Sequence, residues 1–143
     1  DAVSEGIRLC IQSEMKAGED KPEEAVQLAK DALSKAQDKS DKKLEAMALD
    51  SVIAAYIKGE QPEEALGQVN LVLDKYRRGG DKKGEAAMLL KCTEVHLMNK
   101  EPDQGLGPIR DAVSVYRSIS DKAGEAKATC VHAQILLQEN EPA

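Results

Sequence analysis

The residues of this chain best suited to chemistry are two cysteine–histidine pairs. Cys92 and His96 are four positions apart, so on a helix they share one face, and Cys130 and His132 follow in a later predicted helix. Two cysteines with two histidines form a common zinc ligand set. Residues two apart on a helix point in different directions, however, and zinc ligands usually occupy tight turns. The pattern therefore favours small core cysteines with histidines at helix ends, and we expect no metal and no cofactor.

Paired acids are the other feature that resembles a catalytic site. Glu23–Glu24 and Glu63–Glu64 each follow a proline at the start of a predicted helix. Carboxylates in that place interact favourably with the helix dipole and with solvent. No nucleophile motif or phosphate-binding loop accompanies them. We therefore expect that the chain is not an enzyme.

The predicted elements that carry these residues recur every 40 residues, as the even spacing of the repeated prolines shows. A period of this length is typical of stacked repeats, in which each unit packs on its neighbours. We expect a single repeat domain over 1–143, with units at about 1–40, 41–80, 81–120 and a partial unit at 121–143. The repeated residues include Pro22, Pro62, Pro102 and Pro142; Asp41, Asp81 and Asp121; and Glu45, Glu85 and Glu125.

Each period splits into two helices. The first begins after the repeated aspartate, which can accept hydrogen bonds from free amides of the first turn, with Ser40 or Ser120 as alternative caps. The second begins at the repeated proline, which is tolerated at the first helical position, and Gly79–Gly80 is expected to end one of them. No strand pattern is present. The sequence predicts about seven helices, at roughly 3–17, 22–38, 42–58, 62–78, 82–98, 102–119 and 122–139.

One second helix departs from the rule. The other units read Pro-Glu-Glu-Ala, but the segment 102–108 carries Gly105, Gly107 and Pro108. Proline in a helix interior removes a hydrogen bond and clashes with the carbonyl four residues earlier. We expect a kink or a late helix start there. If Pro108 lies in the interior, it costs about 3 kcal/mol and its replacement by alanine raises the melting temperature.

Composition restricts the class of partner. The net charge is −6 and the pI about 5.0, so the chain lacks the basic face that nucleic-acid binding needs. The three cysteines are too few and too scattered for a disulfide framework, which indicates a cytoplasmic protein. No apolar run approaches the length of about 20 residues that spans a membrane. Without phenylalanine or tryptophan, the core must be built mainly from alanine and aliphatic residues.

The repeated unit resembles the tetratricopeptide repeat (TPR), in a lengthened 40-residue form. That family's unit is shorter, at about 34 residues. Further departures are Ile53 and Thr93 at a small-residue position and Gly105 at the helix crossing. The resemblance implies an all-α fold, a right-handed α-solenoid of antiparallel helix pairs. The residues that carry it are Ala48, Leu49, Val52, Ala55, Tyr56, Ala65, Val69 and Val72.

In the TPR family, the concave face of the first helices binds extended or helical peptides. Asp50 and Glu94 would repel an anionic peptide tail, so the resemblance implies a partner with apolar anchors. Leu90, Leu97 and Met98 are expected to form an exposed apolar strip, with packing on a neighbouring helix as the alternative. The positions carried over to this face are Met47, Asp50, Ala54, Ile57, Leu90, Lys91, Glu94, Leu97, Met98, Lys127, Gln134 and Gln138.

Two functions fit these observations. The first is a non-catalytic protein-interaction scaffold that binds a peptide or helix. The second is a structural array of copies that self-associate through exposed solenoid ends. Pro142 lies where a further helix should begin, so we expect the chain to be a segment of a longer array.

Overall fold

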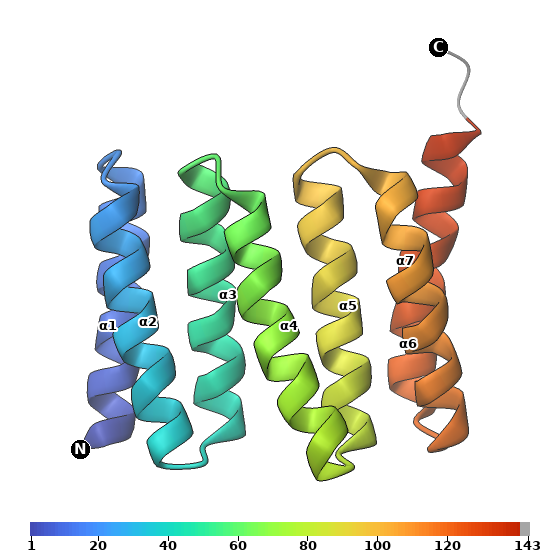
Figure 1. Cartoon of the computed structure of the whole chain (residues 1–143), viewed down its shortest axis with the longest axis horizontal. Coiled ribbons are helices and arrows are strands. Elements are labelled where there is room, and N and C mark those ends of the chain that lie inside the picture. The colour runs from blue at the N-terminus through green and yellow to red at the C-terminus, as the bar shows by residue number, and fades with distance from the viewer. Residues whose placement is uncertain (141–143) are drawn as a thin grey trace. The chain divides into compact units, whose positions relative to one another are not determined.

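The structure, a computed structural model, describes residues 1–140 and is all-helical over that range (Figure 1). It confirms the expected all-α fold and every expected helix except one, which is divided. The right-handed solenoid stays a prediction, and Pro142 lies outside the described residues. The elements are α1 (Ala2–Gly18), α2 (Pro22–Asp38), α3 (Lys42–Lys58), α4 (Pro62–Gly79), α5 (Lys82–Met98), the 3-10 helix η1 (Pro102–Gly105), α6 (Leu106–Ser118) and α7 (Lys122–Glu139).

The repeated aspartates cap the odd-numbered helices, as predicted. The Asp41 carboxylate accepts a hydrogen bond from the Leu44 amide at 3.0 Å, and Asp81 and Asp121 accept equivalent bonds at 2.9 and 3.0 Å. Asp1 does the same at the start of α1. These bonds satisfy amides that have no partner within the helix. The alternative caps Ser40 and Ser120 are wrong, because both residues belong to the preceding turn.

Within residues 1–140, each of the six turns contains one residue with positive φ, and these residues are evenly spaced along the chain. They are Asp20, Ser40, Glu60, Gly80, Lys100 and Ser120, with φ between 52° and 70°. The amide after each donates to the carbonyl five residues earlier, as Asp41 does to Ala36 at 2.9 Å. This is the Schellman helix end, which usually has glycine at the left-handed position. Among these six residues, Gly80 alone is a glycine. The predicted Gly79–Gly80 helix end is confirmed.

The expected irregularity of the sixth helix is a 3-10 turn followed by a late start. η1 covers Pro102–Gly105, and α6 begins at Leu106. Pro108 is therefore the third residue of α6, where an amide would have no helical partner in any case. The cost expected of Pro108 applied only to an interior position, and Pro108 lies in the first turn of α6 instead.

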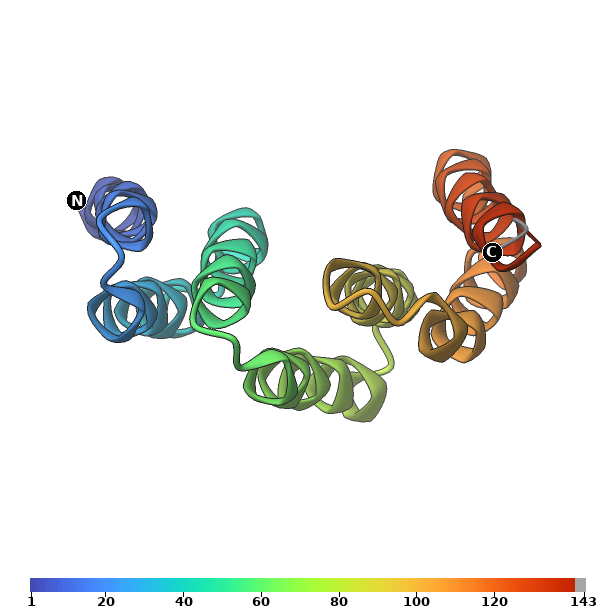
Figure 2. The same cartoon turned by 90° about the horizontal axis from the view of Figure 1, so that it is seen from above.

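The chain divides into two compact units, residues 1–68 and 69–143. In the first, α1 and α3 lie on the same side of α2 (Figure 2). The Ser13 hydroxyl on α1 donates to the Ala25 carbonyl on α2 at 2.7 Å, so the two helices lie close together at this buried contact. The core is built mainly from alanine and aliphatic side chains, as the composition predicts: Leu9, Ala25, Ala29, Ala32, Leu33, Leu44, Ala48, Leu49 and Val52.

The second unit repeats this contact two periods later along the chain. The Thr93 hydroxyl on α5 donates to the Leu89 carbonyl of its own helix at 3.1 Å and lies 3.4 Å from the Gly105 carbonyl of η1. A side chain on Gly105 would meet both Thr93 and Ile135. Glycine at this position thus lets η1 approach α5 and α7 closely. Ile109 and Ile135 are fully buried beside it.

A tyrosine ring lies over a glycine at two of the turns. A Cβ atom on Gly84 would lie 2.7 Å from the ring of Tyr76, and one on Gly124 would overlap the ring of Tyr116. By the 40-residue period, Ala36 and Leu44 occupy these positions in the first repeat. The large and small side chains have exchanged places. The turn therefore accepts either a large residue before it or a large residue after it.

Candidate functional site

Exposed apolar side chains concentrate on the odd-numbered helices. The described residues include ten large apolar side chains classed as exposed, and eight of them lie on α1, α3, α5 or α7. Only Leu71 on α4 and Ile119 at the end of α6 do not. Single exposed apolar residues are normal, but a group on one helix indicates a contact surface. The odd-numbered helices are therefore the candidate binding elements.

Four of the eight form a row along α1. Val3, Ile7, Ile11 and Met15 are spaced by four residues, so they share one helix face, and they are exposed by 38, 37, 54 and 60%. This row of four side chains, here called the α1 row, was not predicted from the sequence. The 40-residue period applied backwards from Met47 would have located Ile7.

The residues predicted on the odd-numbered helix of the first unit are mostly accessible. Met47 on α3 is 39% exposed, and Asp50 and Ala54 are exposed as well. Ile57 is half-buried. Since α3 packs directly against α1, Met47 lies on the helix next to the α1 row. Their role in binding stays a prediction.

The predicted strip on α5 is only partly exposed. Leu90 is 4% exposed, so the expectation that it lies on the surface is wrong. Its burial agrees with the alternative, that Leu90 packs on a neighbouring helix. Lys91, Glu94 and Leu97 are half-buried, and Met98 is 54% exposed. Accessible apolar surface is therefore confined to the C-terminal end of the helix. On α7, the predicted positions Lys127, Gln134 and Gln138 are exposed and polar.

The cysteines differ sharply in environment. Burial raises the pKa of Cys92 to about 11, and its thiol donates to the Asn70 side-chain oxygen at 3.6 Å. Burial also raises the pKa of Cys10 above its ordinary value. Both thiols are thus held in the protonated form, which is a poor nucleophile and a poor metal ligand. Cys130 is exposed on α7.

The two histidines do not join the cysteines in a metal site. His96 Nδ1 lies 3.7 Å from the Glu101 carboxylate, at the end of α5. His132 is on α7, and its Nε2 atom is buried without a hydrogen-bond partner among the described residues. Across residues 1–140, no three His, Cys, Asp or Glu side chains are grouped so that they could hold a metal ion.

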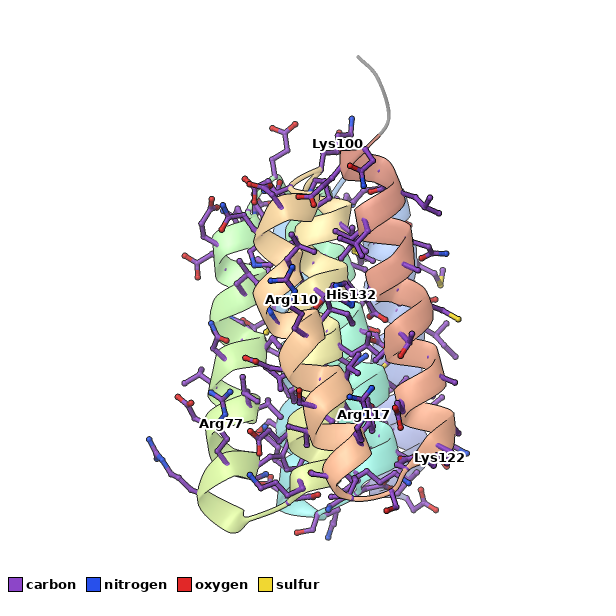
Figure 3. All side chains as sticks on the ribbon, turned by 90° about the vertical axis from the view of Figure 1, so that its right-hand side faces the viewer. Arg77, Lys100, Arg110, Arg117, Lys122 and His132 are labelled. Carbon is purple, nitrogen blue, oxygen red and sulfur yellow. The ribbon has the colours of Figure 1, made fainter. Side chains whose placement is uncertain are left out.

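The repeated glutamates form ion clusters at two turns. The Glu85 carboxylate accepts from Lys82 at 3.0 Å and from Arg77 at 3.2 Å. Glu125 accepts from Arg117 at 2.9 Å, with Lys122 at 3.7 Å. Figure 3 shows Arg117 and Lys122 at the turn that joins α6 to α7. Lys82 and Arg77 lower the pKa of Glu85, and Arg117 and Lys122 lower that of Glu125.

We expect these clusters to contribute an acid-sensitive part of the stability. A carboxyl whose pKa is lowered by folding stabilises the protein above its ordinary pKa, and the contribution disappears as the pH falls through the lower folded value. The melting temperature of the double variant Glu85→Gln/Glu125→Gln should therefore fall less than that of the wild type between about pH 5 and about pH 3. Circular dichroism melting curves measure this. Glu63→Gln, at an exposed position, should leave the pH dependence unchanged; equal slopes for all three proteins would contradict the prediction.

No helix among the described residues is long and apolar enough to cross a membrane. No protein-family model matches the chain, and a search of curated proteins also gives no match. The resemblance to the TPR family therefore stays a prediction that rests on the repeated residues.

Proposed function

We propose that this chain is a non-catalytic protein-interaction scaffold that binds a peptide or a helix of a partner protein through its odd-numbered helices. The observation that carries the proposal is the concentration of exposed large apolar side chains on those helices. An apolar surface kept in contact with water is unfavourable unless a partner covers it. The TPR-like repeat is consistent with this role.

The chemistry of the chain supports a binding role over a catalytic one. Cys10 and Cys92 are buried thiols with raised pKa values. The acids that resemble pairs in the sequence, such as Glu63–Glu64, lie exposed in the first turn of a helix. The repeated glutamates 85 and 125 are neutralised by arginine and lysine. We place the protein in the cytoplasm, since all three cysteines are free.

Self-association through the ends of the helix array is the second candidate. On α7, Leu136 and Leu137 are 39 and 69% exposed, and the row on α1 is exposed as well. Such faces could pack on one another in a homo-oligomer. Sedimentation velocity at several concentrations separates the two functions. A monomer at every concentration excludes the array.

The scaffold function predicts that a peptide bound to the first unit depends on Met47 of α3, and that a peptide bound to the second unit depends on Met98 of α5. Peptides selected from a displayed random library with the wild-type chain as bait provide the ligand. Met47→Gln should weaken the peptides that bind the first unit about tenfold, and Met98→Gln those that bind the second, while the melting curve stays unchanged because both side chains are exposed. Fluorescence anisotropy measures the affinity.

Leu71→Gln is the matched control. Leu71 is 66% exposed but lies on the even-numbered helix α4, so its replacement should not affect binding. Leu97→Gln adds a test at a half-buried position: lost binding with an unchanged melting curve supports a surface role, and a large loss of stability assigns Leu97 to the core. If no peptide is selected, or if all variants bind equally, the proposal fails.

A further inference from the structure

A hollow of about 150 Å³ lies between α2 and α3 in the first unit. α1 packs on both of these helices, and the residue before α4, Gln61, belongs to the lining. The hollow therefore has a helix of the chain on either side of it along the sequence, unlike the outer faces of α1 and α7. The residues that line it are Pro22, Glu23, Val26, Tyr56, Gly59 and Gln61.

Most of the wall of the hollow is apolar. Pro22 and Val26 are four residues apart at the start of α2, so they share one helix face. Tyr56 lies on α3, and its ring is the only aromatic side chain in residues 1–68. Gly59 contributes only backbone, and a Cβ atom there would lie 3.1 Å from the Cβ atom of Pro22. These walls suit a narrow apolar stem.

Two polar side chains, Glu23 and Gln61, complete the lining. Neither side chain has a hydrogen bond or an ion pair within the described part of the chain. The neighbouring carboxylates of Glu19 and Glu24 differ, because Lys16 lies 3.0 Å from the first and 3.7 Å from the second. An unpaired negative charge and an unpaired amide therefore stand together at the hollow.

The protein already places one cation against the ring of Tyr56. The Lys30 ammonium lies 5.3 Å from the ring centroid, a distance at which the ring quadrupole attracts a cation. Lys30 follows Pro22 by two helical turns and is not one of the residues that line the hollow. The ring is thus suited to a cation, and the chain itself does not fill the space beside it.

The charge around the hollow also favours a cation. The turns that follow α1 and α3 lie at the same end of the unit, because both helices run antiparallel to α2 (Figure 1). Residues 18–24 and 58–64 contain seven acidic and two basic side chains. One of the two basic residues, Lys21, is paired with Glu19 at 3.7 Å. Carboxylates within a Debye length of about 10 Å attract a basic side chain to this end.

We propose that this hollow is the anchor pocket for an arginine side chain of a partner protein. The apolar stem of the arginine packs on Pro22 and Val26, and its guanidinium group lies beside the ring of Tyr56 and donates to Glu23 and Gln61. Arginine fits better than lysine, because its planar group stacks on aromatic rings and donates in two directions at once. A leucine or methionine would gain nothing from Glu23. This inference rests on the proposed scaffold function and specifies one residue of the partner.

The test uses n-butylguanidinium, which has the stem and the charged group of arginine. The first control is n-butylurea, which has nearly the same shape without the charge, and the second is guanidinium, which has the charge without the stem. The amide signals of Val26, Gly59 and Gln61 in the ¹⁵N-labelled protein report binding at the hollow. We expect n-butylguanidinium to bind at least about fivefold more tightly than either control, and more weakly as salt rises from about 50 to about 300 mM.

Glu23→Gln tests the charged group of the pocket. Glu23 is exposed in the first turn of α2, so the variant should fold normally and lose at least about threefold in affinity for n-butylguanidinium. Glu63→Gln is the matched control. Glu63 follows a proline at the start of α4, one period later, and does not line the hollow, so its replacement should change the affinity less than about twofold.

Gly59→Ala tests the space itself. The added methyl group narrows the hollow against Pro22, and the φ of −83° at Gly59 is open to alanine. We expect a loss of at least about fivefold in affinity for n-butylguanidinium with no fall in the melting temperature. Gly67→Ala, where an added Cβ atom would meet nothing within 4 Å, should bind as the wild type does. If Gly59→Ala melts early, the comparison of Glu23→Gln with Glu63→Gln decides.

Equal affinity for n-butylurea or for guanidinium would overturn the inference. So would equal losses in Glu23→Gln and Glu63→Gln, or signal shifts at the three amides no larger than those elsewhere in the protein. None of these results removes the scaffold function if the selected peptides still respond to Met47→Gln or Met98→Gln. If the peptides respond to neither variant while n-butylguanidinium binds as expected, the scaffold function fails and the pocket remains.

Discussion

Replacing Gly124 with leucine is expected to lower the free energy of unfolding by about 2 kcal/mol. The residue is the third of α7, and the ring of Tyr116 occupies the space where its side chain would lie. Tyr116 is 7% exposed and cannot move without uncovering apolar surface. Leucine has a better intrinsic helix propensity than glycine by about 0.8 kcal/mol. Any loss of stability therefore reports the clash with the ring.

The first repeat indicates how the loss can be reversed. Ala36 and Leu44 stand there at the positions of Tyr116 and Gly124, shifted by two periods, and both are buried. Tyr116→Ala alone should cost about 3 kcal/mol, because it leaves a cavity. In the double variant Tyr116→Ala/Gly124→Leu, the leucine should fill part of that cavity. We expect a double variant more stable than either single variant, which requires a coupling energy of about 3 kcal/mol or more.

Urea unfolding of the four proteins measures this cycle. Gly107→Leu is the matched control, since a side chain at that helical glycine would meet nothing within 4 Å. Its stability should stay level or rise. If the losses at Gly124 and Tyr116 simply add, the ring does not fill the space above the glycine, and the proposed exchange of large and small residues between repeats is wrong.

Most of the fold could be predicted because its signals are local. Asp41, Asp81 and Asp121 cap helices through their own side chains, and a proline at a helix start needs no distant partner. The effect of Pro108 was harder to predict, since it depends on whether the proline lies inside a helix or in its first turn. The 3-10 turn before α6 decides this. It arises where Gly105 packs against Thr93 and Ile135, far away in the sequence.

The candidate site was less predictable, because exposure depends on which neighbour covers a face. Leu90 and Met98 both fit the pattern expected of a surface strip, yet Leu90 is 4% and Met98 54% exposed. Helical spacing identifies a shared face but not its neighbour. The α1 row has the same types of residue as a buried face. Only the observed packing of α1 shows that Ile7 and Ile11 remain uncovered.

Glycine at the left-handed turn positions is expected to stabilise the protein strongly. Ser40, Glu60, Lys100 and Ser120 each adopt φ between 52° and 60°. For a residue with a Cβ atom, this conformation costs about 1–2 kcal/mol, whereas glycine adopts it freely and loses about 0.5–1 kcal/mol through its greater freedom in the unfolded chain. The net gain is about 0.5–1 kcal/mol per position. No hydrogen bond or ion pair of these four side chains within the described residues would be lost.

The quadruple variant Ser40→Gly/Glu60→Gly/Lys100→Gly/Ser120→Gly should therefore gain about 2–4 kcal/mol, since turns at separate helix ends contribute almost independently. Urea unfolding gives the free energy, and a thermal melt should show a higher midpoint. Asp20 is left unchanged because aspartate tolerates this conformation better than serine, glutamate or lysine does.

Gly79 and Gly80 provide a matched control within a single turn. Gly80 has φ of 70°, and Gly79 has ordinary helical geometry with no atom within 4 Å of an added Cβ. Gly80→Ala should cost about 1 kcal/mol, while Gly79→Ala should be neutral or stabilising. Equal effects at the two positions, or a quadruple variant no more stable than the wild type, would show that these turns do not hold the left-handed conformation in solution. The Schellman helix ends would then not explain why the helices are evenly spaced along the chain.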